Sequence, residues 1–167
     1  MKTIVVGLGN PILGDDGVGW KVVDEIQRCL TSPPAPLLPG EGSQVDVEYL
    51  SLGGIGLMEH LIGYDCAILI DSFISQEEDV GSILIRRLND LPNYSAFHIT
   101  SAHDTSLQNA IELGRSVGAH LPEEVTVIGI AIQCIYDFGE ELSPSVAEAV
   151  PEAAHIALNL LRQVVMV

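Results

Sequence analysis

The stretch MKTIVVGLGNPILGDDGVGWKVVDEIQ, residues 1–27, decides the fold that this sequence predicts. Ile4, Val5 and Val6 are typical of a buried strand, and apolar residues at helical spacing over 18–30 predict an amphipathic helix. The glycine-rich turn between them carries two adjacent acids, Asp15 and Asp16. In open α/β sheets ligands bind outside the carboxyl ends of the strands, so this turn places two carboxylates where a site is expected.

The rest of the chain continues the alternation of strands and helices. Strands are expected at 45–50, 65–71, 81–87 and 125–132, and helices at 57–62, at 104–117 and from Pro144 onward, with Ser143 as N-cap. This order predicts an α/β fold, a three-layer α/β/α sandwich on a mixed, mainly parallel five-stranded sheet with one antiparallel strand.

Three local features give more specific expectations. Only about nine residues separate strands 65–71 and 81–87, too few for a crossover helix, so these two strands should pair antiparallel. The segment GGIG at 53–56 is expected to form a turn. Pro151 should kink or split the last helix.

Length and composition indicate one domain over residues 1–167, with a Pro-rich surface loop at 31–44. The apolar runs are strand-length, so no membrane span is expected, and the start of the chain is not typical of a secretory signal. The three cysteines are scattered without CxxC spacing, which favours a reducing compartment and a cytoplasmic location.

The formal net charge of −16, with only seven Lys and Arg residues, makes nucleic acid a poor partner. An acidic surface suits a cation or a protein with a basic segment. Simple solubility is the alternative interpretation of the same charge.

Three residues point to a divalent-metal site. Asp16 follows the first strand, Asp71 ends the third, and His103 precedes the helix at 104–117. Because the carboxyl ends of parallel strands share one edge, we expect these side chains to converge there, as a site suited to nickel, zinc or cadmium.

Each of these residues also has a purely structural interpretation. Asp15 and Asp16 would suit the cap of the first helix, and Asp15 is expected to cap it in any case. Asp71 suits a strand-end turn, His103 suits a helix cap or a surface position, and His98 is a competing imidazole between apolar neighbours.

Motifs of several enzyme classes are absent. There is neither a GxSxG nucleophile elbow nor an HExxH zinc helix in the sequence. The glycine-rich turn does not suit a dinucleotide, because Asp15 and Asp16 would repel a pyrophosphate where it needs bare amides.

Taken together, these motifs resemble the hydrogenase maturation endopeptidases, which process the large subunit of nickel–iron hydrogenases. The resemblance rests on GLGNPILGDDGVG at 7–19, ILID ending at Asp71, SAHDTSL at 101–107 and LSPSVAEAVPEA at 142–153. Two features depart from the family pattern: the Pro-rich stretch 31–44 is long, and Ile55 stands where a threonine is common.

The resemblance implies a phosphorylase/hydrolase-like fold and a peptide-bond hydrolase. It implies that Asp16, Asp71 and His103 bind metal and carry catalysis. The implied cofactor is nickel supplied by the precursor, with zinc or cadmium as substitutes. The implied partner is a hydrogenase large-subunit precursor, whose C-terminal extension is cleaved.

Two other functions remain as alternatives. A non-catalytic, metal-sensing or chaperone-like binding module on the same fold would use the same metal site. A peptidyl-tRNA hydrolase shares the opening GLGNP, but the sequence continues with GDDGVG and lacks the basic residues that tRNA binding requires.

Overall fold

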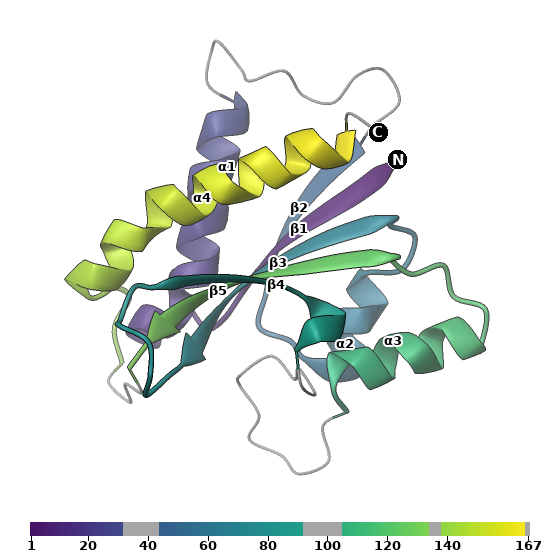
Figure 1. Cartoon of the computed structure of the whole chain (residues 1–167), viewed down its shortest axis with the longest axis horizontal. Coiled ribbons are helices and arrows are strands. Elements are labelled where there is room, and N and C mark those ends of the chain that lie inside the picture. Colours follow the sequence, from purple (N-terminus) through teal and green to yellow (C-terminus); the bar gives the residue numbers. More distant parts are fainter. Residues whose placement is uncertain (32–43, 92–104, 134–137, 166–167) are drawn as a thin grey trace.

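The computed structural model describes residues 1–31, 44–91, 105–133 and 138–165 (Figure 1). Most of the Pro-rich stretch at 31–44 therefore lies outside the described residues. The elements in chain order are β1 (Lys2–Leu8), the short 3-10 helix η1 (Gly14–Gly17), α1 (Val18–Thr31), β2 (Gln44–Leu50), α2 (Gly54–His60), β3 (Cys66–Ile74), β4 (Ile83–Arg87), the 3-10 turn η2 (Leu88–Asp90), α3 (Leu107–Ser116), β5 (Glu124–Ile132) and α4 (Pro144–Val165).

The five strands form one mixed sheet in the order β2-β1-β3-β5-β4. Strands β1, β2, β3 and β5 are parallel, and β4 runs antiparallel to β5. The carboxyl ends of the four parallel strands consequently lie at the same edge of the sheet, called the carboxyl edge below.

Helices cover both faces of the sheet. Figure 1 shows α1 and α4 on one face and α2 and α3 on the other. Each face of the sheet has its own hydrophobic core, and successive residues of a strand point alternately into one or the other. In β3, Ala67 and Leu69 pack on the α2–α3 side, whereas Ile68 and Ile70 pack on the α1–α4 side. The expected three-layer sandwich is confirmed. In the part of the chain that the structure describes, no helix combines the length and hydrophobicity that a membrane span requires.

The neighbour predicted for β4 was wrong, although its antiparallel direction was right. The sequence paired it with β3, but the structure inserts β5 between the two. The central place suits β5, whose residues are almost all buried, whereas β4 exposes Ile85, Arg86 and Arg87. Charged side chains on a short strand are typical of a sheet edge, and they disfavour a place in the middle.

The expected turn at 53–56 is wrong in part, because α2 begins at Gly54 and ends at His60. Gly53 is the N-cap, and Gly54 has a φ of +51°. A Cβ at Gly54 would come 2.6 Å from the backbone oxygen of Thr105. The glycine therefore allows the start of α2 to lie directly against the chain that leads into α3.

Pro151 does not split the last helix, since α4 is a single helix from Pro144 to Val165. A proline inside a helix leaves the carbonyl four residues earlier, here that of Ala147, without its usual donor. Ala147 and Pro151 are both exposed. Water can therefore satisfy that carbonyl, and the helix continues through the proline.

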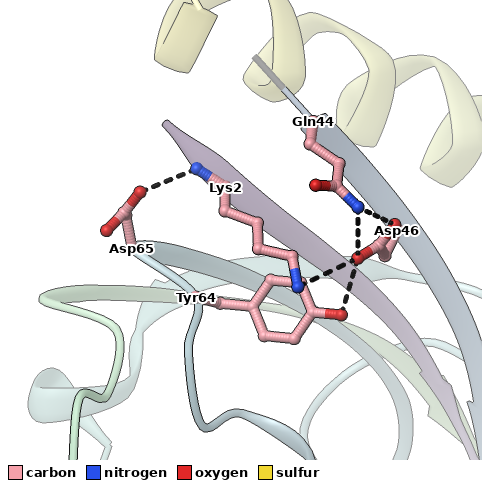
Figure 2. A network of polar contacts seen from close by, with 5 residues as sticks. All are labelled: Lys2, Gln44, Asp46, Tyr64 and Asp65. Carbon is pink, nitrogen blue, oxygen red and sulfur yellow. Dashed lines mark hydrogen bonds and ion pairs between the residues drawn. The ribbon is translucent and has the colours of Figure 1, made fainter. Parts of the chain in front are cut away.

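A polar network ties the strands together at the opposite edge, where they begin (Figure 2). The Lys2 backbone N–H donates to Asp65 at 2.7 Å, and the Lys2 ammonium lies 3.5 Å from Asp46. The Tyr64 hydroxyl donates to Asp46 at 2.8 Å, and Gln44 donates to the same carboxylate. The Tyr64 hydrogen bond lowers the pKa of Asp46, and burial, helped by that bond, raises the pKa of Tyr64 to about 12.

Candidate functional site

The acid loop, residues 9–17, folds back over the end of β1. Gly9 has a φ of +126°, and a Cβ there would overlap the backbone oxygen of Asp16. Within the loop, the backbone N–H of Leu13 donates to the Asn10 carbonyl at 3.1 Å. Only glycine at position 9 lets the loop come this close, so the turn motif positions the acids that follow it.

Asp16 and Asp71 both contact Ser72. The Ser72 hydroxyl donates to Oδ1 of Asp16 at 3.2 Å, and the Ser72 backbone N–H donates to Oδ1 of Asp71 at 2.9 Å. The other oxygen of Asp16 accepts the Asn10 backbone N–H at 2.8 Å. Asp16 is 9% exposed and Asp71 is 1% exposed. Both carboxylates are therefore buried and hydrogen-bonded to Ser72, and their joint role in a metal site stays a prediction.

The two carboxylates approach the carboxyl edge from different faces of the sheet. Side chains alternate along β3, so Asp71 shares the α2–α3 face with Leu69, and Ser72 shares the α1 face with Ile70. Asp16 reaches Ser72 from η1, which directly precedes α1. The site therefore straddles the edge of the sheet.

The expected end of the third strand at Asp71 was three residues too early. Strand β3 continues to Ile74, and its pairing with β5 continues with it. Its pairing with β1 ends at Ile70, one residue before Asp71. Asp71 therefore lies just past the last residue of β3 that pairs with β1, next to Ser72, which the acid loop contacts.

Asp15 does not cap the first helix as expected. No side-chain hydrogen bond caps η1, and Asp15 instead accepts the backbone N–H of Ser143 at 2.6 Å. Ser143 directly precedes Pro144, the first residue of α4, so the carboxylate of Asp15 lies at the positive end of that helix. Asp15 joins the acid loop to α4.

His103, the third predicted site residue, and the competing His98 lie outside the described residues. The described chain resumes at Thr105, which lies against Gly54 at the carboxyl edge. Ser106 then caps α3, its hydroxyl accepting the Asn109 backbone N–H at 3.2 Å. Within the described residues, no three His, Cys, Asp or Glu side chains are grouped so as to hold a metal ion.

The arrangement supplies oxygen acceptors rather than a conventional nucleophile. The carboxylates of Asp16 and Asp71 act as acceptors, and Ser72 donates to each of them, to Asp16 through its hydroxyl and to Asp71 through its backbone N–H. Sequence reasoning missed Ser72, which looked like part of a strand-end turn. The apolar Phe73 and Ile74 that follow it are the signal that the strand continues.

The chain matches a family model described as hydrogenase maturation protease over residues 21–160. Asp71 and His103 lie inside the matched range, and Asp16 lies just before it. Two curated relatives are similar over nearly the whole chain. The hydrogenase expression/formation protein HoxM of Azotobacter vinelandii is 27% identical, covering 96% of this chain and 72% of its own length. The hydrogenase 2 maturation protease of Escherichia coli K12 is 24% identical, covering 98% and 92%.

Solved structures share the fold. The hydrogenase maturating endopeptidase HybD from Escherichia coli superposes with a TM-score of 0.75 at 23% identity, covering 98% of this chain and 93% of its own. A hydrogenase 2 maturation peptidase from a Thaumarchaeota archaeon has a TM-score of 0.63 at 27% identity, covering 96% and 98%.

Proposed function

Because this chain belongs to the hydrogenase maturation protease family, we propose that it recognises nickel in a nickel–iron hydrogenase large-subunit precursor and cleaves the precursor's C-terminal extension. In this proposal the nickel arrives with the precursor and is part of the substrate. The observation that carries the proposal is the contact of Asp16 and Asp71 with the same residue, Ser72.

We propose that the acids at the carboxyl edge bind the divalent cation that the precursor carries. The two buried carboxylates provide negative charge and oxygen ligands, and the Ser72 hydroxyl orients the carboxylate of Asp16. We assign His103 as the third ligand, because the chain two residues further on lies at the same edge against Gly54. An imidazole beside two carboxylates suits nickel or zinc better than magnesium or calcium.

Bound at these residues, the metal would polarise the scissile carbonyl or lower the pKa of an attacking water. The chain's own contribution is to hold its carboxylates in place before the substrate arrives. The Asn10 backbone N–H and the Ser72 hydroxyl hold the two oxygens of Asp16, and the Ser72 backbone N–H holds one oxygen of Asp71. Such fixed geometry lowers the cost of ordering the site on binding.

The decisive experiment incubates the purified protein with nickel-loaded and with nickel-free precursor and measures the precursor's mass. We expect loss of the C-terminal extension from the loaded form alone. Asp16→Asn and Asp71→Asn should slow processing on the order of a hundredfold or more, because loss of a ligand costs at least as much as loss of its supporting partner. Asp90→Asn, an exposed acid of η2, is the matched control and should process normally.

The two histidines provide a second comparison. We expect His103→Ala to abolish processing and His98→Ala to leave it unchanged, with both proteins folded by circular dichroism. Equal loss in both variants would mean that the imidazole is wrongly assigned. Tight binding of the loaded precursor without cleavage would instead favour the non-catalytic binding module. Equal cleavage of the loaded and nickel-free precursors would contradict nickel recognition.

A further inference from the structure

Exposed apolar side chains gather at the carboxyl edge of the sheet. Five of the ten large hydrophobic residues that are exposed in the described part of the chain lie on segments at the carboxyl ends of parallel strands. We call them the apolar rim: Ile12, Leu52, Ile55, Ile74 and Phe138. Ile74 is 51% exposed and Phe138 is 82% exposed. Large apolar groups collected around a site mark an interaction surface more often than single scattered ones do.

Hydrogen bonds hold the segments of the rim next to the acid loop. The Gly139 backbone N–H donates to the Ile12 carbonyl at 3.0 Å, which places Phe138 beside Ile12. On the other side, the Ser51 hydroxyl donates to the Gly9 carbonyl at 2.7 Å, which places Leu52 beside the same loop. Ile74 ends β3 three residues after Asp71. The rim therefore borders the carboxylates.

The margin of the rim is acidic. Glu77, Glu78 and Asp79 follow Ile74, and Glu140 and Glu141 follow Phe138; all five are exposed. The Ser75 hydroxyl accepts the backbone N–H groups of Glu77 and Glu78, which holds the first cluster in a defined turn. An apolar centre with charged margins is the usual anatomy of a protein–protein interface.

We propose that the apolar rim is the docking surface for the folded body of the precursor, whose contact surface is apolar in its centre and carries Lys and Arg at its margin. This inference rests on the proposed function and adds the chemistry of the partner surface to it. A single metal contact would not orient a large protein. Docking on the rim would orient the precursor so that its C-terminal segment meets Asp16 and Asp71, and the acidic margin would speed encounter with a basic surface.

The test measures binding and cleavage of nickel-loaded precursor separately. In the double variant Ile74→Thr/Phe138→Ser we expect KM to rise about tenfold or more, with kcat within about twofold of wild type, because the rim contributes binding and not chemistry. The control Leu113→Ser/Val117→Ser changes two exposed apolar residues at α3, and its KM should stay at the wild-type value. Substitutions at exposed positions should leave all of these proteins folded.

A second pair of variants tests the acidic margin. Glu77→Gln/Glu78→Gln/Asp79→Asn should slow association several-fold at low salt and flatten its dependence on NaCl. The control Glu148→Gln/Glu152→Gln removes exposed acids of α4 and should retain the wild-type salt dependence.

The outcomes separate this inference from the proposed function. If wild type cleaves the precursor and the rim variant has wild-type KM, the docking surface is refuted and the proposed function stands. If wild type binds but does not cleave, the proposed function fails, and the rim is still judged by the change in Kd. If wild type neither binds nor cleaves the precursor, both are refuted.

Discussion

Gly9 is the single residue on which the position of the acid loop depends most. Its φ is +126°, and a Cβ would overlap the Asp16 backbone oxygen. We expect Gly9→Ala to lower the free energy of unfolding by more than about 3 kcal/mol, because a positive φ alone costs about 1–3 kcal/mol and the overlap adds to it. Urea denaturation followed by circular dichroism measures the loss.

Gly63 provides the matched control for Gly9. Its φ is +88°, and a Cβ there would meet nothing within 4 Å. Gly63→Ala should therefore cost only the conformational strain, about 1–2 kcal/mol. Equal losses in the two variants would mean that the close approach of the acid loop to β1 contributes nothing.

The sequence predicted where the acids of the carboxyl edge lie, but not all of their hydrogen-bond partners. Asp16 and Asp71 were predictable because each stands near the end of an apolar strand, and parallel strands end at a common edge. The partner of Asp15 was not, because Ser143 is 128 residues away in the chain and the contact exists only after α4 has packed. Contacts between distant segments leave no local pattern.

Two hydrogen bonds join the acid loop to the segment that leads into α4. Asp15 accepts the Ser143 backbone N–H, and the Gly14 N–H donates to the Gly139 carbonyl at 2.6 Å. We expect Asp15→Ala to destabilise the protein by about 2 kcal/mol, since it leaves a partly buried N–H without its acceptor and removes a favourable charge at the helix end. Thermal and urea unfolding would both report it.

Glu148→Ala is the control for the Asp15 variant, because it removes an exposed acid from the same helix. Its effect should stay within about 0.5 kcal/mol. If the two substitutions cost the same, Asp15 is not a specific anchor for α4.

Strands and helices were predictable where the apolar pattern was long. Which strands pair with each other in the sheet was harder to predict. The order of elements and the antiparallel direction of β4 followed from spacing and loop length. The place of β4 beyond β5 did not, because either neighbour satisfies a short connection. Burial decides it: β5 is the more apolar strand, and β4 carries Arg86 and Arg87.

Across the whole molecule, the two ends of the parallel strands differ in the residues they carry. The carboxyl edge holds buried acids and exposed apolar groups, an arrangement that favours binding over stability. The opposite edge holds the network of Lys2, Asp46, Tyr64 and Asp65, which links residues of β1 and β2 to the segment before β3 (Figure 2). We infer that this network fastens the starts of the first three parallel strands, far from the candidate site.

Because of this network, we expect the free energy of unfolding to depend on pH in the acidic range. The Tyr64 hydrogen bond lowers the pKa of Asp46 below its ordinary value of 3.8. A carboxyl group with a lowered folded pKa stabilises the protein above its unfolded pKa of about 4, and this stabilisation is lost as the pH falls through the folded pKa. Asp46→Asn should therefore be less stable than wild type at pH 6 and equally stable near pH 2.

The size of this difference is limited by water, because the Asp46 side chain is 32% exposed. We expect at most about 1 kcal/mol at pH 6. Urea midpoints of wild type and Asp46→Asn between pH 2 and pH 6 measure it, with Glu148→Gln as a control that keeps the network intact. A stability difference that stays constant over this range would show that Asp46 acts through packing, because a charge effect must disappear once the carboxyl group is protonated.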